Sequence, residues 1–230
     1  MVPLPDEEAQ HATRVLRLGT GAAIRVFDGR GHEFDAVVEQ AGKTGVLVRV
    51  GPARTPVAEP RVAVTLVQAV LKGDKMDDVV RDAVMLGVTA VQPIVSKRTE
   101  TTVAALMRGA RIDRWRRVAL ASVKQSGRAV LPEIRTPLIL EDWLGDPRPA
   151  MTLMLVEPRI EIESLTVLRD QRAPPDAAVV VGPEGGWSEV EVEMARGRGV
   201  RFVSLGPRTL RADAVPVAAL SVLQFLWEAS

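Results

Sequence analysis

Hydrophobic and polar positions change their pattern near residue 59. Before it, the apolar runs are short, and turn residues such as Asp28-Gly29-Arg30-Gly31 and Ala41-Gly42 separate them. A helical pattern with Pro5 and acidic residues at its start precedes these runs. Together these features predict a small, mostly antiparallel β unit. Its expected elements are a helix over residues 5–18 and strands over 22–28, 33–40 and 43–50.

The segment GPARTPVAEP (51–60) is typical of a linker, because it carries three prolines within nine residues. We therefore expect two domains, residues 1–58 and 59–230. In the second, apolar strands alternate with helices, which predicts an α/β fold with a mainly parallel sheet covered on both faces. The expected strands are 62–70, 88–95, 151–156, 177–181 and 201–205, and the expected helices are 74–86, 112–125, one starting at Ser188 and 213–227.

The amino-acid composition excludes several kinds of catalytic and metal site. The chain has no Cys and only two His, His11 and His32, so a disulfide scaffold, an iron–sulfur cluster, a Cys nucleophile and a multi-His metal site are not expected. No apolar run approaches the ~20 residues that span a bilayer, and the acidic N-terminus does not resemble a secretory signal. We expect a cytoplasmic protein that binds neither metal nor membrane.

The charges nearly balance, with 30 basic and 29 acidic side chains, but they are unevenly distributed. Residues 97–135 carry ten basic and three acidic side chains. Such a stretch fits a phosphate backbone, where each neutralised phosphate releases counterions, or else a solvated helix face.

Three strands in the C-terminal half end alike, each at a Pro preceded by Gly or Glu: LMLVEP (153–158), VVVGPEGG (179–186) and VSLGP (203–207). Ligands gather at the carboxyl ends of parallel strands, and Gly lets the backbone approach them closely. These turns predict a pocket of main-chain groups suited to a flat heterocycle such as adenine, unless they are ordinary βα turns. No P-loop, dinucleotide fingerprint or nucleophile elbow is present in the sequence.

Several longer motifs resemble one family. GPEGGWSEVE (182–191) and LGPRTLRAD (205–213) are similar to the closing motifs of SPOUT-class methyltransferases, and more closely to those of the bacterial small-subunit (16S) rRNA uracil-N3-methyltransferases. Upstream, four further segments resemble that family in order and spacing: HATRVLRL (11–18), VFDGRGHEF (26–34), LKGDKMDDVVRDAVMLGVTAVQPIVSKR (71–98) and ALASVKQSGRAVLPEI (119–134). Nearly the whole chain is covered.

The resemblance implies a PUA-like β-barrel that binds RNA, followed by a SPOUT domain with a C-terminal trefoil knot. It also implies a homodimer that uses S-adenosylmethionine to methylate N3 of a uridine, in small-subunit rRNA or in the assembled small ribosomal subunit. The cofactor would lie among Glu157, Gly182, Pro183, Glu184, Gly185, Gly186, Leu205, Gly206, Leu210 and Arg211.

The chain departs from the family pattern after LGPR. Asp213 stands where the family has Glu, and Pro216 enters the start of the last helix. Two alternatives therefore stay open: a non-catalytic RNA-binding or ribosome-assembly factor, and a SPOUT enzyme that modifies a ribose 2′-OH or another base.

Methylation at uracil N3 requires that the imide lose its proton. Arg211 is expected to stabilise the charge that spreads onto the uracil oxygens, or else to form a salt bridge or contact a phosphate. Asp213 would accept the N3 proton or cap the last helix. Glu184 would bind cofactor or substrate, or cap the helix that starts at Ser188.

Because N3 lies on the Watson–Crick edge, the uridine must be unpaired or flipped out to react. Arg14 and Arg17, three apart on the predicted first helix, would share a face. The side chains expected to follow the RNA, with a solvated surface as the alternative, are Arg14, Arg17, Arg98, Arg116, Arg117, Lys124 and Arg128.

Overall fold

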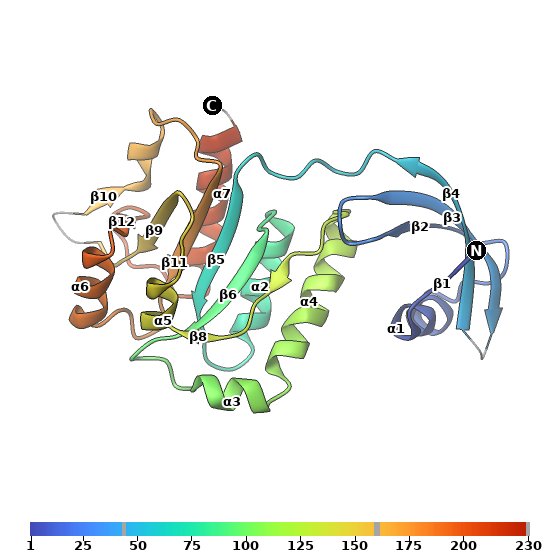
Figure 1. Cartoon of the computed structure of the whole chain (residues 1–230), viewed down its shortest axis with the longest axis horizontal. Helices are drawn as coiled ribbons and strands as arrows, with labels where there is room; N and C mark the ends of the chain where they lie inside the picture. The colour runs from blue at the N-terminus through green and yellow to red at the C-terminus, as the bar shows by residue number, and fades with distance from the viewer. Residues whose placement is uncertain (43–44, 159–161, 229–230) are drawn as a thin grey trace. The chain divides into compact units, whose positions relative to one another are not determined.

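The computed structural model describes residues 1–42, 45–158 and 162–228 (Figure 1). The chain divides into two compact units, Met1–Ala58 with Gly127–Leu131, and Glu59–Ser126 with Pro132–Ser230. Residues 127–131 thus belong to the smaller unit, although the expected division of the chain at residue 58 assigned them to the larger one.

The smaller unit is built on an antiparallel sheet in the order β1-β4-β3-β2. Buried Val38 of β3 pairs with buried Val48 of β4, and Ala9 of the helix packs on the same small core. The predicted antiparallel β unit is therefore confirmed. Its elements are β1 (Val2–Pro3), α1 (Asp6–Gln10), a π-helical turn (His11–Val15), β2 (Ala23–Phe27), β3 (Glu33–Gly42) and β4 (Gly45–Arg54).

Strand β4 runs four residues further than predicted, so the expected linker over 51–60 is partly wrong. Pro52 is tolerated there because the register of β3 and β4 shifts between Phe34 and Ala36. Such an irregularity leaves a position where no ladder N–H is needed. Residues 43 and 44 of the expected strand over 43–50 lie outside the described residues.

The helix predicted over residues 5–18 ends earlier, at Val15. Arg17 has a φ of 53°, a left-handed conformation that a helix cannot continue through, and the Leu18 N–H donates back to the Ala12 carbonyl over 2.9 Å. Arg14 and Arg17 therefore do not share a helix face as the periodicity predicted.

The larger unit contains a parallel sheet in the order β10-β12-β9-β11-β5-β6-β7, with β8 also paired to β6. This confirms the predicted α/β class and mainly parallel sheet. The elements are β5 (Ala63–Ala69), α2 (Lys75–Met85), β6 (Ala90–Val95), α3 (Val103–Arg108), α4 (Arg111–Ser126), β7 (Glu133–Ile134), β8 (Leu138–Ile139), α5 (Leu140–Gly145), β9 (Met151–Leu155), β10 (Glu163–Ser164), a 3-10 turn (Leu165–Leu168), β11 (Asp176–Val181), α6 (Glu189–Gly197), β12 (Arg201–Ser204) and α7 (Val215–Glu228).

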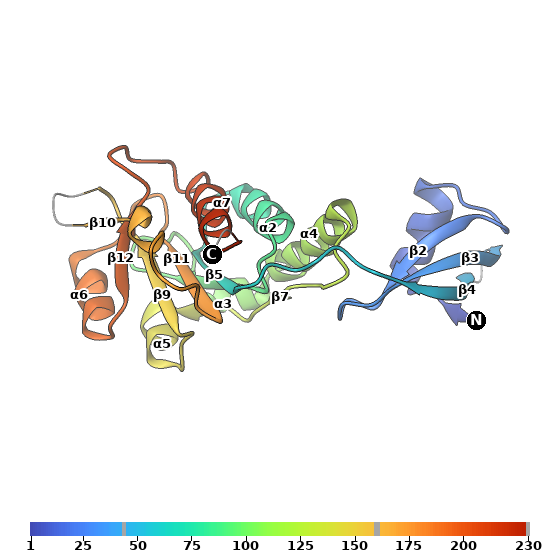
Figure 2. The same ribbon diagram turned by 90° about the horizontal axis from the view of Figure 1, so that it is seen from above.

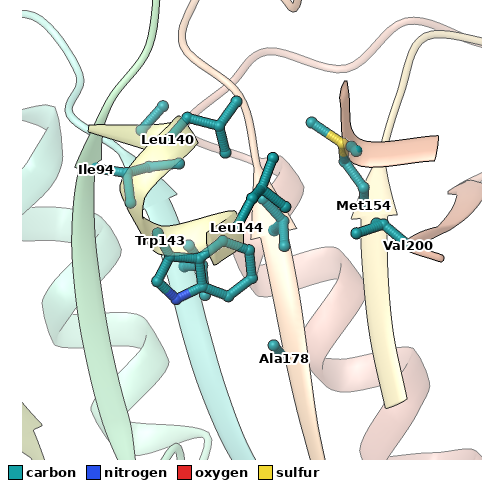
Figure 3. Close-up of a cluster of buried hydrophobic side chains, with 11 residues drawn as sticks. Ile94, Leu140, Trp143, Leu144, Met154, Ala178 and Val200 are labelled. Atoms are coloured by element: carbon teal, nitrogen blue, oxygen red, sulfur yellow. The ribbon is translucent and has the colours of Figure 1, made fainter. Parts of the chain in front are cut away.

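Helices cover both faces of this sheet (Figure 2). On one face, α5 and α6 pack on the strands through a cluster that includes Trp143, Leu144, Met154 and Ala178 (Figure 3). On the other face lie α2, α4 and α7 (Figure 2). Helix α2 buries residues spaced as one helical stripe, among them Met76, because apolar side chains at every third or fourth position face the sheet.

No helix in the described part of the chain combines the length and apolarity needed to cross a membrane. Within residues 1–42, 45–158 and 162–228, no three His, Asp or Glu side chains come together as a potential metal site.

Candidate functional site

The three turns singled out by their sequence begin at neighbouring strands. β9 lies between β12 and β11 in the sheet, and all three run parallel. The segments that follow them, 156–158, 182–187 and 205–214, therefore leave the same edge of the sheet side by side. The structure thus brings the predicted loops together at the carboxyl edge.

Loop 182–187 is fixed at its far end by Trp187. The indole Nε1 donates to the Leu155 carbonyl at the end of β9 over 2.9 Å. The ring lies so close to Gly182 that a Cβ there would be 3.0 Å from indole Cε2. Gly186 has a φ of 66°, where L side chains are strained. Glycine is thus needed at both positions, for packing at 182 and for backbone conformation at 186.

Arg98, which the sequence predicts to contact RNA, contacts this loop in the structure. It follows β6, and its Nη1 donates to the Gly185 carbonyl over 2.6 Å. A Cβ on Gly185 would lie 3.1 Å from Arg98 Cβ. The side chain therefore lies along the glycine segment.

Glu184 does not cap the helix that follows. Ser188 and Glu191 form a capping box at the start of α6, and Glu191 Oε1 also accepts from the Lys97 amide over 2.7 Å. The Glu184 carboxylate accepts instead from Lys75 Nζ over 2.8 Å and from the Lys72 amide over 3.2 Å. The cap interpretation of Glu184 is wrong, because Ser188 and Glu191 already cap the first turn of this helix.

Burial and hydrogen bonding act in opposite directions on the pKa of Glu184. Desolvation by partial burial would raise the pKa of this carboxyl group, but the hydrogen bonds from Lys75 and from backbone amides lower it overall. Glu184 is therefore anionic at neutral pH.

Arg211 and Asp213 form a two-pronged ion pair. Nε donates to Oδ1 over 3.1 Å and Nη2 to Oδ2 over 3.2 Å. Arg211 remains 75% exposed. Helix α7 begins at Val215, so Ala214 and not Asp213 occupies the position before its first residue. The salt-bridge interpretation of Arg211 is confirmed, and the cap interpretation of Asp213 is not.

The pKa of Asp213 is lowered. Burial alone would raise it, but the hydrogen bonds from Arg211 and from the backbone, and the charges of Arg211 and Lys75, outweigh that effect. Lys75 thus acts on carboxylates of two different loops.

The remaining predicted residues lie on the same loops. Glu157 approaches the glycine segment, since a Cβ on Gly186 would be 3.5 Å from its Oε1. Pro183 is buried, and Leu205 is half-buried. Gly206 has a φ of 106° with open space beside it, and Leu210 is exposed.

The side chains that the sequence predicts to contact RNA differ in how exposed they are. Arg116 pairs with the Asp113 carboxylate over 3.0 Å, and Arg117 donates weakly to the Asp113 carbonyl. Arg128 is only 6% exposed, which leaves little of it for a ligand. The side chains of this set that are exposed are Arg14, Arg17, Arg98, Arg116, Arg117 and Lys124.

Sequence reasoning does not identify two residues that lie near the loops, Lys75 and Gln68. Lys75 lies on the first turn of α2 and gave no signal beyond its place in a motif. Gln68 is fully buried near the end of β5; its amide donates to the Ala69 and Gly182 carbonyls, and its Oε1 has no partner among the described residues. A Gln inside the apolar run VTLVQAV was the sequence signal for it.

Comparisons with known proteins agree with this geometry. Residues 58–224 match the model of an RNA methyltransferase domain, and residues 4–51 match an RNA methyltransferase PUA domain. A structure of a methyltransferase from Legionella pneumophila, solved with the cofactor SAM, is 31% identical and covers 97% of this chain and 91% of its own, with a TM-score of 0.89. A ribosomal RNA small subunit methyltransferase E from Neisseria gonorrhoeae, bound to S-adenosyl methionine, is 32% identical, covers 98% and 92%, and has a TM-score of 0.87.

Relatives found by sequence similarity include further ribosomal RNA small subunit methyltransferases E. The ribosomal RNA small subunit methyltransferase E of a Synechocystis strain is 31% identical over 99% of this chain and 74% of the relative. That of Mycobacterium bovis is 31% identical over 97% and 87%. The resemblance in the closing motifs is thereby confirmed over the whole length of the chain, and the chain belongs to the RNA methyltransferase family that contains the ribosomal RNA small subunit methyltransferases E.

Proposed function

We propose that this protein methylates N3 of a uridine in small-subunit ribosomal RNA with S-adenosylmethionine as the methyl donor. One observation carries the proposal: three loops, two of which contain the family's closing motifs, leave adjacent parallel strands at one edge of the sheet. Two similar structures were solved with this cofactor, which supports assigning it to these loops.

The residues present fit such a cofactor. The glycine segment 185–186 exposes main chain, and Gly206 has open space on its Cβ side. A nucleoside of this kind is held mostly through backbone amides and carbonyls, which need close approach. We assign its binding to Glu157, Gly182, Pro183, Glu184, Gly185, Gly186, Leu205, Gly206, Leu210 and Arg211. When bound, the cofactor supplies an electrophilic methyl group on sulfonium.

In this proposal, Arg211 and Asp213 form the catalytic pair: Arg211 acts on the substrate, and Asp213 positions Arg211. Arg211 is exposed and carries its positive charge toward a bound base, where negative charge spreads over the uracil oxygens as N3 loses its proton. Asp213 holds the guanidinium through both oxygens. Its lowered pKa makes it a weak proton acceptor, so we assign it the orientation of Arg211 and assign the final proton acceptance to solvent.

The proposal includes the PUA-like unit as an RNA-holding domain and a trefoil knot formed by the closing loops. It also includes a homodimer in the cytoplasm. Helix α7 supports the dimer, because it carries exposed apolar side chains at Val217, Val222 and the 72% exposed Phe225 that a partner could bury.

The test is methylation in vitro of small ribosomal subunits, and of naked rRNA, from a strain that lacks its own N3-uridine methyltransferase. Nucleoside mass spectrometry should find N3-methyluridine. A ribose-methylated nucleoside or another methylated base would replace the proposal by a different SPOUT activity. Failure to bind S-adenosylmethionine at millimolar concentration would instead favour the assembly-factor alternative.

A further inference from the structure

Two cationic side chains from different turns hold neighbouring residues of loop 182–187. Lys75 starts helix α2 after β5, and Arg98 lies in the turn after β6. Lys75 Nζ contacts the Glu184 side chain over 2.8 Å, and Arg98 Nη1 contacts the Gly185 carbonyl over 2.6 Å. Both strands neighbour each other in the sheet, with β5 next to β11, from which the loop leaves.

The loop needs such contacts because of its composition. Gly182, Gly185 and Gly186 fall within five consecutive residues, and glycine has the largest backbone freedom to lose. Fixing one residue's backbone costs about 1–2 kcal/mol, which a ligand must supply if the protein does not. Trp187 secures only the end of the loop near α6.

We propose that Lys75 and Arg98 are positioning residues that together preorganise residues 184–186 for the cofactor. Their reach is complementary: one holds a side chain and the other a main-chain carbonyl of the next residue. Arg98 is thereby moved from the RNA-contacting set to the cofactor loop. This inference rests on the proposed cofactor site.

The surrounding charges are consistent with this role. Glu184 also accepts from the Lys72 amide, so its carboxylate ties the loop to the start of α2 at two points. Lys75 additionally lowers the pKa of Asp213, so the same ammonium group acts on the loop that carries Arg211. The turn after β6 is held separately, by the bond from the Lys97 amide to Glu191. Arg98 therefore projects from a base that is itself anchored.

The test compares Lys75→Ala, Arg98→Ala and the double variant with Arg81→Ala. Arg81 is a matched control because it lies on the same helix, is exposed and pairs only with Asp78 and Asp82 in the contacts described. Calorimetry with S-adenosylmethionine should show each single variant about three- to tenfold weaker, since both contacts are partly exposed. Arg81→Ala should bind as the unaltered protein does, and Lys75→Arg should restore most of the loss.

A double-mutant cycle tests the Lys75–Glu184 contact. Lys75→Ala/Glu184→Ala should bind no more weakly than the weaker single variant, because either change removes the same contact. Losses that multiply would overturn the pairing as the cause.

RNA binding separates the two interpretations of Arg98. If Arg98 positions the loop, Arg98→Ala leaves the salt dependence of RNA affinity unchanged. A slope lowered by about one, with cofactor affinity intact, would make it a phosphate contact and overturn the inference.

Hydrogen–deuterium exchange of the ligand-free protein tests the positioning role of Lys75 and Arg98 without relying on cofactor binding. Amides of residues 184–187 should exchange faster in the Lys75→Ala/Arg98→Ala variant. Exchange of the other amides, and the melting temperature, should not change. Equal exchange would refute the positioning role. If the unaltered protein binds no S-adenosylmethionine while exchange responds as expected, the proposed function fails and the positioning role stands.

Discussion

Gly182→Ala is expected to destabilise the protein through a single carbon atom. The added Cβ would lie 3.0 Å from Trp187 Cε2, 3.2 Å from Nε1 and 3.3 Å from Cζ2, whereas ordinary contacts are 3.4–4 Å. The indole must therefore move by a few tenths of an ångström. It is not free to do so, because Nε1 is bonded to the Leu155 carbonyl over 2.9 Å and the ring packs on the cluster beneath α6.

Overpacking of this kind costs roughly 1–3 kcal/mol. For a chain of this size, each kcal/mol lowers the melting temperature by about 2–4 °C, so Tm should fall by about 2–12 °C. Gly197→Ala is the matched control: nothing lies within 4 Å of its Cβ position, and it ends α6 without a positive φ. That change should be neutral or slightly stabilising, because alanine favours helix over glycine by up to about 1 kcal/mol.

Thermal unfolding followed by circular dichroism measures both variants. Adding Trp187→Phe to Gly182→Ala should recover part of the loss, since the smaller ring leaves room for the new methyl group, while the bond to Leu155 is lost in either background. If Gly182→Ala and Gly197→Ala unfold at the same temperature, the contact between Gly182 and the indole does not constrain the loop. The conclusion that Trp187 fixes the end of the loop near α6 is then refuted.

Three further changes test the loops. Gly185→Val should abolish cofactor binding by calorimetry while unfolding stays cooperative, because its side chain meets the flexible Arg98 and not a fixed ring; retained affinity would remove Gly185 from the pocket. Arg211→Ala should lower kcat by about 100-fold with a smaller loss of cofactor affinity, and equal losses would make it a binding residue. Glu184→Gln should be less stable than the unaltered protein at pH 7. Because the pKa of Glu184 is lower in the folded protein than its ordinary value of 4.5, the ionised carboxylate contributes its full stabilisation above pH 4.5. That contribution is lost as the pH falls below 4.5 and through the folded pKa. Urea unfolding at several pH values should show the two proteins converge in acid, and a gap that persists there would contradict the ion-pair argument.

The sequence predicted the long elements and not the short ones. Helix α2 and strand β11 are long enough for their periodicity to be read, and both lie within a residue or two of the expected positions. Helix α5 has only six residues, too few for a period, and is stabilised by burying Trp143 and Leu144 against distant strands. Its existence depends on tertiary contacts that a local pattern does not contain.

Strand β4 illustrates a different limit. Proline usually ends a strand, so the sequence places Pro52 in a linker, yet a register shift against the paired strand β3 accommodates it. The information that made Pro52 acceptable lies in β3, at Phe34 and Ala36. A similar dependence shortened the first helix, where Arg17 adopts a positive φ that its own side chain does not favour.

The loops of the candidate site were predicted because their glycines and prolines are local signals, but the contacts among charged residues were not. Sequence spacing cannot show that Lys75 meets Glu184, 109 positions away, or that Arg98 meets Gly185. Parallel strand order creates these contacts, since β6, β5, β11 and β9 deliver their following turns to one edge. Residue type alone assigned Arg98 to RNA, because arginine suits phosphate. Arg98 Nη1 donates to the Gly185 carbonyl, and because a guanidinium carries five N–H donors, this contact does not exclude a second one to a phosphate. A charge count along the chain therefore identifies Arg98 as a candidate RNA contact, but it cannot reveal the contact to the glycine loop that the fold adds.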